Sequence, residues 1–450
     1  MSKTIRLRKG LNIRIKGKAD KVFIKAARSD QYAIKPPDFQ GLTPKLTVKT
    51  DDVVKAGSPL FFDKYNPEIV FTSPVSGIVS AIVRGERRRI LEVIINADAD
   101  DKYIEFGKAD PNQLSKEQII EKLTKSGLWP FIRQRPYGII ASQKDTPKSV
   151  FISAFDTAPL GTDRDFMVTG EEKAFQTGID AIAKLTEGKI NLNVNAKYPA
   201  SPVYAKAKKV QLNYFTGPHP AGNVGVQIHH IDPINKGDIV WYLYPQDVIT
   251  IGRLFEKGIY DAGRIVALAG SEVLKPRYYK ILIGASIKQI IKDNIKEGNV
   301  RYISGNVLTG TKIPANGFVG FYDTQVAVIP EGSYYEMLGW ALPGINKFSM
   351  SRSFLSWLQP GREYRLDTNL HGGKRPFVIT GEYEKVVPMD IYPVQLLKSI
   401  LVNDIDKMEQ LGIYEVIEED LALCEYVCTS KTDVQDILRK GLDLIRKEMS

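Results

Sequence analysis

The sequence predicts a multidomain α/β protein, and three observations support that prediction. The chain has 450 residues, which is too long for one compact core. Short strand-like runs separated by turn residues fill its first hundred residues, and strands then alternate with helices. The chain turns helical from about residue 388. We therefore expect a small β barrel-sandwich (1–100), a doubly wound α/β domain (101–258), a small α+β module with an adjoining β segment (259–380), and a C-terminal helical domain (381–450).

Residues 1–100 resemble a lipoyl/biotinyl-like domain. The stretches "VKTDDVVKAGSPLFFDK" and "SPVSGIVSAIVRGERR" match the two halves of that fold in order and spacing. Such domains carry a modified lysine at a hairpin tip, and Lys64 lies at the corresponding turn. The chain is therefore either a swinging-arm carrier or a protein that reuses the fold without the chemistry. The second alternative is favoured, because Asp63 stands where biotin addition favours Met, and Asp63 and Asn66 can stabilise the turn through backbone contacts.

The second domain begins with a helical signal. Ser115 and Gln118 have the spacing of a capping box, and a later run places Phe175, Ile179 and Ile182 on one helical face. Apolar runs between the helices read as strands. This alternation predicts a mostly parallel, Rossmann-like sheet. The expected strands span 149–155, 190–194 and 209–215, and a further helix spans 247–258.

The stretch "TGPHPAGNVGVQIHH" (216–230) follows one of these strands. Its glycine spacing fits neither dinucleotide nor P-loop motifs, and its prolines remove backbone donors that a phosphate would need. We interpret it as a rigid connecting loop; the alternative is a groove for a neutral ligand or a partner protein, built on Gly217, His219 and Gly222. His229 and His230 are expected to point apart on a strand, so a shared metal ion is not predicted.

The stretch "GLWPFIRQRPYG" (127–138) is a candidate quinone site. Aromatic rings can stack on a quinone, and a guanidinium can donate to its carbonyls. The same composition suits a partner interface, and the sequence does not separate the two. The candidate residues are Trp129, Phe131, Arg133, Arg135 and Tyr137.

No catalytic constellation or metal-ligand cluster emerges elsewhere. Cys424 and Cys428 lie four residues apart on an expected helix, and two thiolates cannot hold an iron–sulfur cubane alone. We expect a buried structural pair. Catalytic residues and resident metal ions are therefore not predicted for this chain.

Charge, apolar content and cysteine number narrow the possible classes of protein further. The net charge of +10 is scattered, and its densest cluster, "RGERRR" (84–89), has no nucleic-acid-binding motif beside it. Nucleic-acid binding is not predicted, and a solvated or docking face is favoured. No run of about 18 apolar residues exists, and the first residues do not form a signal peptide. Two cysteines fit a reducing cytoplasm.

Seven segments in order resemble the A subunits of sodium-translocating NADH:quinone reductases. They include "FISAFDTAPLGTDRDFMV", "TGPHPAGNVG", "RIVALAGSEVLKPR" and "EEDLALCEYVC", and the resemblance covers essentially the whole chain. It implies a complex that oxidises NADH, reduces ubiquinone or menaquinone, and exports sodium ions. It also implies that residues from about 264 form a β-grasp module of the soluble-ligand-binding type.

The resemblance implies a role for this chain within such a complex. The expected subunit is peripheral, lies on the cytoplasmic side of the bacterial inner membrane, and contacts the other subunits (B to F), chiefly the membrane-embedded B subunit. It binds no redox cofactor, because Trp129, Phe131 and Arg133 stand where the flavin-binding relatives in complex I and the Rnf complex have a glycine-rich loop. In one interpretation of its role, the subunit contributes to quinone binding. The alternative interpretations are a swinging-arm carrier or a purely structural scaffold.

Overall fold

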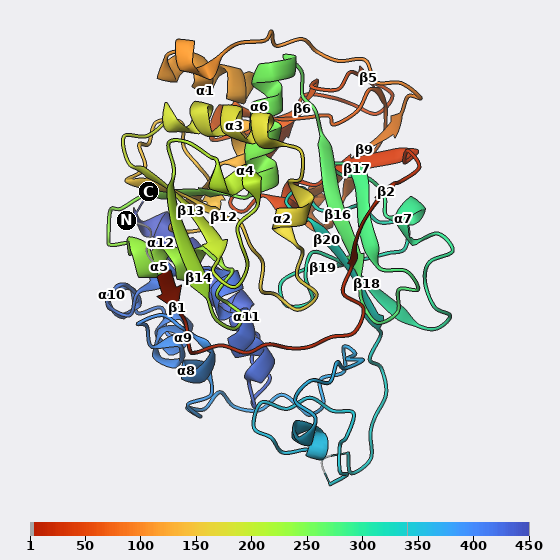
Figure 1. The fold of residues 1–450 in the computed structure, drawn as a ribbon, viewed down its shortest axis with the longest axis vertical. Helices are drawn as coiled ribbons and strands as arrows, with labels where there is room; N and C mark the ends of the chain where they lie inside the picture. Colours follow the sequence, from red (N-terminus) through yellow and green to blue (C-terminus); the bar gives the residue numbers. More distant parts are fainter. Residues whose placement is uncertain (1–3, 340, 450) are drawn as a thin grey trace.

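A computed structural model of the chain describes residues 4–339 and 341–449. Four sheets and a group of C-terminal helices make up the fold (Figure 1). The barrel strands and helix α1 (Lys116–Lys125) lie at one end of the long axis, and the segment after the last strand forms the other end.

A seven-stranded sheet lies at the centre. Four neighbouring strand pairs are parallel, and the two pairs that involve β10 are antiparallel. This matches the predicted mostly parallel sheet. In spatial order the strands are β1 (Thr4–Arg6), β14 (Gln211–Thr216), β13 (Lys189–Asn195), β12 (Ser149–Ser153), β15 (Val240–Leu243), β10 (Arg133–Arg135) and β11 (Ile139–Ile140).

The two faces of this sheet bury different cores, because successive strand residues point to opposite sides. Val150 and Ile152 pack with Phe175 of α3 (Glu172–Ala183) and with α6 (Pro245–Lys257). Phe151 belongs to the other core, together with apolar side chains of α5 (Val224–Ile231). The predicted capping box is confirmed: Ser115 and Gln118 each accept the other's backbone N–H at the start of α1. Two one-turn helices complete the domain: α2 (Arg164–Met167) and α4 (Pro202–Ala205).

The barrel-sandwich consists of two antiparallel sheets. Lys64 lies at the exposed turn between β6 and β7, and Asp63 Oδ1 accepts the backbone N–H of Tyr65 at 3.3 Å, as predicted for a stabilised turn. Asn66 differs from the prediction, because its amide donates to Gln143 Oε1 of the next domain at 2.7 Å. The hairpin is therefore tied to the α/β domain. The strands are β3 (Gln31–Ile34), β9 (Ile90–Ala97), β8 (Gly77–Arg84) and β5 (Val53–Val54), facing β4 (Pro44–Leu46), β6 (Pro59–Asp63) and β7 (Asn66–Thr72).

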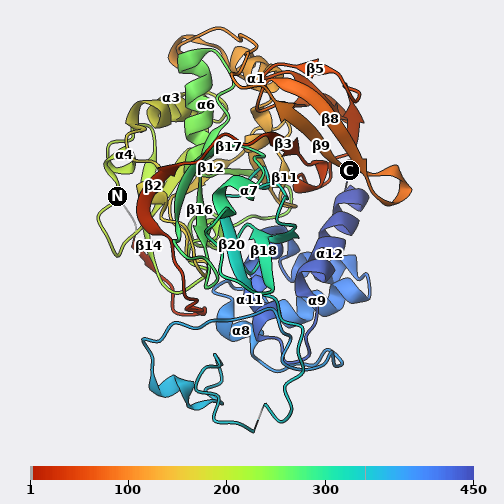
Figure 2. The ribbon, with the colours of Figure 1, turned by 90° about the vertical axis from the view of Figure 1, so that its right-hand side faces the viewer.

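Residues 4–25 contribute no strand to the two barrel sheets. β1 pairs with β14 in the central sheet. β2 (Asp20–Lys25) pairs with β17 in a six-stranded sheet (Figure 2). The partners lie some 200 residues or more further along the chain, so no local pattern signals the pairing. The other strands of this sheet are β16 (Gly263–Ala269), β17 (Arg277–Leu282), β18 (Val300–Ser304), β19 (Thr311–Ile313) and β20 (Gln325–Pro330), with helix α7 (Lys288–Ile291) beside them.

The adjoining β segment ends earlier than predicted. After β20, the described residues between 331 and 382 contain no named strand and one short 3-10 helix, Leu355–Leu358. Gly, Pro and Ser interrupt this stretch repeatedly, which prevents a sustained strand. It projects from the body of the molecule (Figures 1 and 2), and we call it the projecting segment.

The C-terminal region is helical, as predicted. Its last helix buries Leu438, Leu442 and Ile445 at helical spacing. Cys424 and Cys428 lie buried as free thiols in the same core, as expected for a structural pair. The helices are α8 (Tyr383–Val386), α9 (Pro393–Leu401), α10 (Ile405–Gln410), α11 (Glu418–Val427) and α12 (Val434–Met449).

The contact between the barrel and the six-stranded module includes a carboxyl group, that of Asp38, which titrates near pH 6. Asp38 Oδ2 accepts the backbone N–H of Phe321 at 2.8 Å. Burial raises the pKa of the Asp38 carboxyl to about 6. Between about pH 4 and pH 6, the native state therefore holds a proton that the unfolded chain has released. The contribution of the protonated carboxyl to the free energy of unfolding is complete below about pH 4 and is lost as the pH rises through about 6.

The substitution Asp38→Asn is expected to remove that pH dependence, because the amide stays neutral and can still accept the Phe321 N–H. The midpoint of thermal unfolding is measured for both chains from pH 4 to pH 8. The midpoint of the variant, relative to that of the natural chain, should rise between pH 4 and pH 6. Glu68→Gln, at an exposed strand position, serves as the control and should follow the natural profile. A difference between Asp38→Asn and the natural chain that does not vary with pH would contradict the assignment.

Candidate functional site

A cavity lies at the carboxyl ends of the parallel strands. The chain passes from β12 to β13 and β14 on one side and returns to β15 on the other, so the strand order reverses around β12. Open α/β sheets bind ligands in the crevice at such a reversal. The cavity has a volume of about 190 Å³. Its wall includes Arg133, Asp156, Arg164, His219, Gly222, Asn223, Tyr244, Asp247, Tyr322, Asp323, Gln325 and Glu419.

The loop after β14 supplies one side of the cavity. His219 and Gly222 line it, and Gly217 lies away from it against Leu7. Gly222 permits a close approach, since a Cβ there would come within 2.8 Å of the backbone N of Thr157. His219 Nδ1 lies 3.1 Å from Thr157 Oγ1, and burial lowers the pKa of His219 to about 4. The imidazole is therefore neutral at pH 7, and the loop is fixed by internal contacts.

The histidine pair is helical, which corrects the expectation of a strand. His229 and His230 lie in the last turn of α5, with ring centroids 5.1 Å apart. His229 Nδ1 contacts Glu415 Oε2 at 2.6 Å, and His230 Nδ1 contacts the carbonyl of Val226 at 2.9 Å. Among the residues that the structure describes, no group of three His, Cys, Asp or Glu side chains could hold a metal ion.

The five candidate quinone-binding residues do not share a surface. Trp129 and Phe131 are fully buried in the core between the barrel and the α/β domain. Trp129 Nε1 donates to the carbonyl of Ala141 at 2.7 Å, and Phe131 stacks on Phe321 with centroids 4.7 Å apart. Their rings hold the start of β10 in place and have no free face.

Arg133 reaches the cavity from the first position of β10. Its guanidinium lies over three tyrosine rings, with 4.6, 4.9 and 4.4 Å from the guanidinium carbon to the centroids of Tyr242, Tyr244 and Tyr322. Such contacts stabilise a cation by roughly 0.5–2 kcal/mol each, more when water is excluded. The tyrosines therefore form a cage for a charge that is held close to the ligand space.

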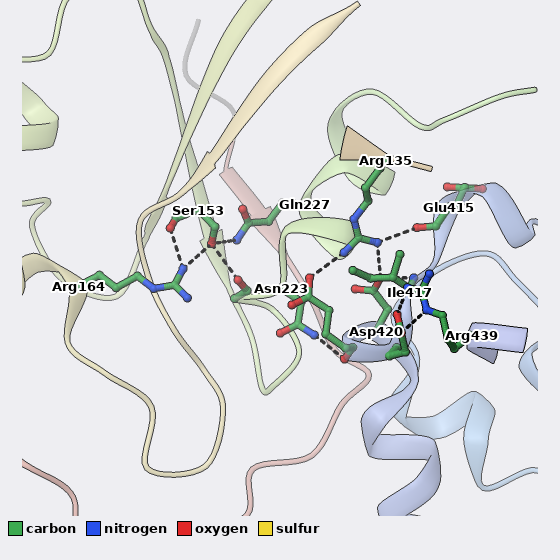
Figure 3. A network of polar contacts seen from close by, with 12 residues as sticks. Arg135, Ser153, Arg164, Asn223, Gln227, Glu415, Ile417, Asp420 and Arg439 are labelled. Carbon is green, nitrogen blue, oxygen red and sulfur yellow. Dashed lines mark hydrogen bonds and ion pairs between the residues drawn. The ribbon is translucent and has the colours of Figure 1, made fainter. Parts of the chain in front are cut away.

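Arg135 lies two residues further along and forms a buried ion-pair network (Figure 3). Its side chain and that of Asp420 are both completely buried, and Nη1 donates to Asp420 Oδ2. Nη2 donates to Glu419 Oε1 at 2.7 Å. Burial raises the pKa of the Glu419 carboxyl, and the adjacent guanidinium opposes that rise. Asp420 also accepts the backbone N–H of Ile417 at 3.0 Å, so one carboxylate both caps α11 and binds the sheet.

The network continues across the sheet edge (Figure 3). Asn223 Nδ2 donates to the carbonyl of Glu419 at 2.8 Å. Gln227 Nε2 donates to Ser153 Oγ at 3.0 Å, and Arg164 Nη1 donates to the carbonyl of Ser153 at 2.7 Å. These contacts connect β12 and α5 of the α/β domain with α11 of the helical domain.

Sequence reasoning missed most of the cavity. Tyr244, Tyr322, Gln325 and Glu419 were not singled out, and Tyr137 lies outside the cavity, half-buried beside Tyr414. The acidic run at the start of α11 is visible in the sequence as a first-turn signal. Its partner Arg135 is 285 residues away, so the sequence gives no sign of the pairing.

No helix within residues 4–339 and 341–449 has the length and apolar character needed to cross a bilayer. The fold and site define a class: a multidomain α/β protein with a polar cavity at the strand-order reversal of a parallel sheet. Three family models match the chain. They are described as the NqrA N-terminal barrel-sandwich hybrid domain (5–98), the NqrA second alpha/beta domain (114–260) and the NQRA C-terminal domain (265–315).

Full-length relatives identify the family. The chain is 40% identical over 449 residues to a Pasteurella multocida protein named as the A subunit of Na(+)-translocating NADH-quinone reductase, with 99% of this chain and 100% of that protein covered. A Hahella chejuensis protein of the same name is 39% identical over 451 residues, with the same coverage. The chain belongs to this NqrA family, the A subunits of Na(+)-translocating NADH-quinone reductases. A solved chain of an NAD+-reducing NiFe hydrogenase is 13% identical, with 67% of this chain and 55% of that chain covered; its TM-score of 0.36 carries no argument.

The substitution Asp420→Asn is expected to destabilise the docking of α11, because it leaves Arg135 buried without its full counter-charge. Breaking a buried pair costs about 3 kcal/mol. Urea-dependent protease cleavage of the helical domain measures this loss. Asp436→Asn is the control, since its ion pair with Lys440 is exposed. The double substitution Arg135→Met with Asp420→Leu should recover stability relative to the single one. An unchanged midpoint for Asp420→Asn would contradict the assignment.

Proposed function

We propose that this chain is the peripheral A subunit of a Na+-translocating NADH:quinone oxidoreductase, on the cytoplasmic side of the bacterial inner membrane. The supporting observation is its similarity to proteins of that name over 99% of its length. The complex couples NADH oxidation and ubiquinone or menaquinone reduction to sodium export. This subunit has no catalytic residues of its own and contacts the other subunits, chiefly the membrane-embedded B subunit.

The proposal includes the absence of a redox cofactor in this subunit. Dinucleotides and flavins bind through backbone N–H groups at the turn after the first parallel strand. In this chain Asp156 Oδ1 accepts the N–H of Ala158 at 2.9 Å, and Asp156 Oδ2 accepts the N–H of Thr162 at 3.2 Å. The carboxylate thus takes the backbone donors of this turn that the phosphates of a dinucleotide or flavin would use.

The projecting segment is the proposed docking surface for the membrane-embedded B subunit. It carries several large apolar side chains on its surface. Exposed apolar patches of this kind mark interaction sites. Translocating sodium ions requires membrane-spanning partners, which this segment is suited to contact. The exposed residues include Tyr335, Met337, Leu338, Leu342, Trp357, Leu358 and Leu370.

Charged substitutions in the projecting segment should prevent assembly. Met337→Glu with Trp357→Glu places charges at positions that are 87% and 49% exposed, so the fold should remain intact. Copurification of the variant with the B subunit is expected to fall at least about tenfold. Tyr198→Glu, at a 60% exposed site on the α/β domain, is the control.

Full assembly of the doubly charged variant would reject this docking surface. Loss of assembly in the Tyr198 control would also count against the docking surface, because it would indicate a general effect of surface charge.

The natural chain purified alone should show no flavin absorption. Flavin in stoichiometric amount would reject the cofactor-free proposal.

Direct quinone contact is the second part of the proposal, and a purely structural scaffold is its alternative. Of the aromatic candidates, Trp129 and Phe131 are enclosed in the core, whereas Tyr137 is half-buried and packs edge-on against Tyr414 with centroids 6.3 Å apart. A ring at the surface can stack on a quinone headgroup. We therefore propose that the ring of Tyr137 makes the contact with quinone.

In the whole complex, Tyr137→Ala is expected to raise the KM for quinone several-fold with little change in kcat for NADH oxidation by an artificial acceptor. Tyr137→Phe keeps the ring and should restore most of the affinity. Tyr103→Ala, at an exposed site in the segment that follows the barrel, is the control. An unchanged quinone KM in Tyr137→Ala would favour the scaffold alternative.

A further inference from the structure

Two side chains on the cavity wall have buried polar atoms without partners. Nε and Nη2 of Arg133, and both amide atoms of Gln325, form no hydrogen bond within the described residues. Gln325 is only 3% exposed. Leaving a buried donor or acceptor unpaired is destabilising, and more so for a charged group, so such atoms call for an explanation. Both residues face the same cavity from different domains.

Within the described residues, Asp247 and Glu419 act on the charge of Arg133 only from beyond ion-pair distance. No carboxylate within the described residues forms an ion pair with it, and the rings of Tyr242, Tyr244 and Tyr322 surround its guanidinium. The adjacent arginine on the same strand, Arg135, has two carboxylate partners. The fold therefore neutralises one arginine of β10 and leaves the other available at the cavity.

The carboxylates of the cavity wall are already engaged. Asp247 Oδ1 accepts from Arg264 at 2.6 Å, and Glu419 accepts from Arg135. Asp323 Oδ2 accepts from Ser304 Oγ at 2.6 Å. Asp156 accepts the backbone N–H groups of its own loop. Of the described residues that line the cavity, Arg133 and Gln325 are the ones with buried side-chain atoms that lack a hydrogen-bond partner.

Two further features make this part of the cavity favourable for negative charge. Arg164 lies over the Tyr244 ring at 4.3 Å from its centroid and lines the same cavity. Helix α5 begins after Asn223, whose side chain does not cap the helix but donates to Glu419. The positive end of the α5 dipole therefore faces the cavity.

The size and polarity of the cavity limit the ligand class. About 190 Å³ is smaller than the roughly 300–1,000 Å³ of pockets that hold drug-sized ligands. A quinone ring would require mainly apolar walls, and this wall is mainly polar and charged. We propose that the cavity binds a small molecule bearing a carboxylate or a phosphate, with the oxyanion held by Arg133 and a second polar group paired with Gln325.

This site goes beyond the proposed function, because neither assembly nor quinone reduction requires it. It is formed by three domains, so a bound ligand would also hold those domains together. A ligand that binds the native state alone stabilises it by mass action. Ligand binding and resistance to unfolding should therefore change together.

Isothermal titration of the purified full-length chain with inorganic phosphate, and separately with malonate, tests the proposal. We expect one saturable site for at least one of these anions and a matching rise in the unfolding midpoint. Arg133→Met should weaken binding at least about tenfold, since a charge-assisted contact is lost. Gln325→Met should weaken it less, and Arg133→Lys should recover part of the affinity.

Arg89→Gln is the matched control, because Arg89 belongs to the exposed basic cluster at 84–89, where anions would bind non-specifically. Its affinity should equal that of the natural chain. The absence of saturable binding for both anions would overturn the proposal. Binding that survives in Arg133→Met and Gln325→Met but falls in Arg89→Gln would also overturn it. A preference between phosphate and malonate identifies which oxyanion the site takes.

Discussion

The buried ion pair between Arg135 and Asp420 is the interaction on which the arrangement of the domains depends. Both side chains are removed from water, so their contact must offset a large desolvation cost with close geometry and further hydrogen bonds. Register in a sheet is all or nothing, because a slip of one residue moves every side chain to the other face. With Arg135 held by α11, Arg133 must face the same side of β10 and meet the cavity. One contact thus determines both how the helical domain docks and where the second arginine lies.

No single domain contains the cavity. Arg133, His219 and Tyr244 come from the central sheet, Tyr322 and Gln325 from the six-stranded module, and Glu419 from the helical domain. Each wall is rigid for its own reason: an ion pair at β10, a loop closed by His219 and Thr157, and a ladder of backbone hydrogen bonds at β20. The space between the walls therefore depends on how the domains pack, and any change in that packing would alter it.

Local structure was predictable where short-range chemistry decides it. The capping box at Ser115 and the apolar stripe at Phe175, Ile179 and Ile182 needed only neighbouring residues. The site was largely not predictable, because composition cannot tell which face of "GLWPFIRQRPYG" meets the core. Trp129 and Phe131 have the chemistry of a stacking site but are enclosed by the packing of two domains. Their neighbour Arg133 was identified as a candidate, but its tyrosine cage comes from segments more than 100 residues away.

The first strand of the chain has a consequence for how the protein is made. β1 leaves a ribosome long before β14, its partner in the central sheet, which begins at Gln211. β2 waits still longer for β17, which begins at Arg277. Contacts between such distant segments form slowly, and unpaired strands are prone to aggregate while they wait. The barrel can mature early, whereas the polypeptide that precedes it must stay open until more than half of the chain has been synthesised. The segment from β1 to β2 thus pairs late in synthesis and connects two sheets.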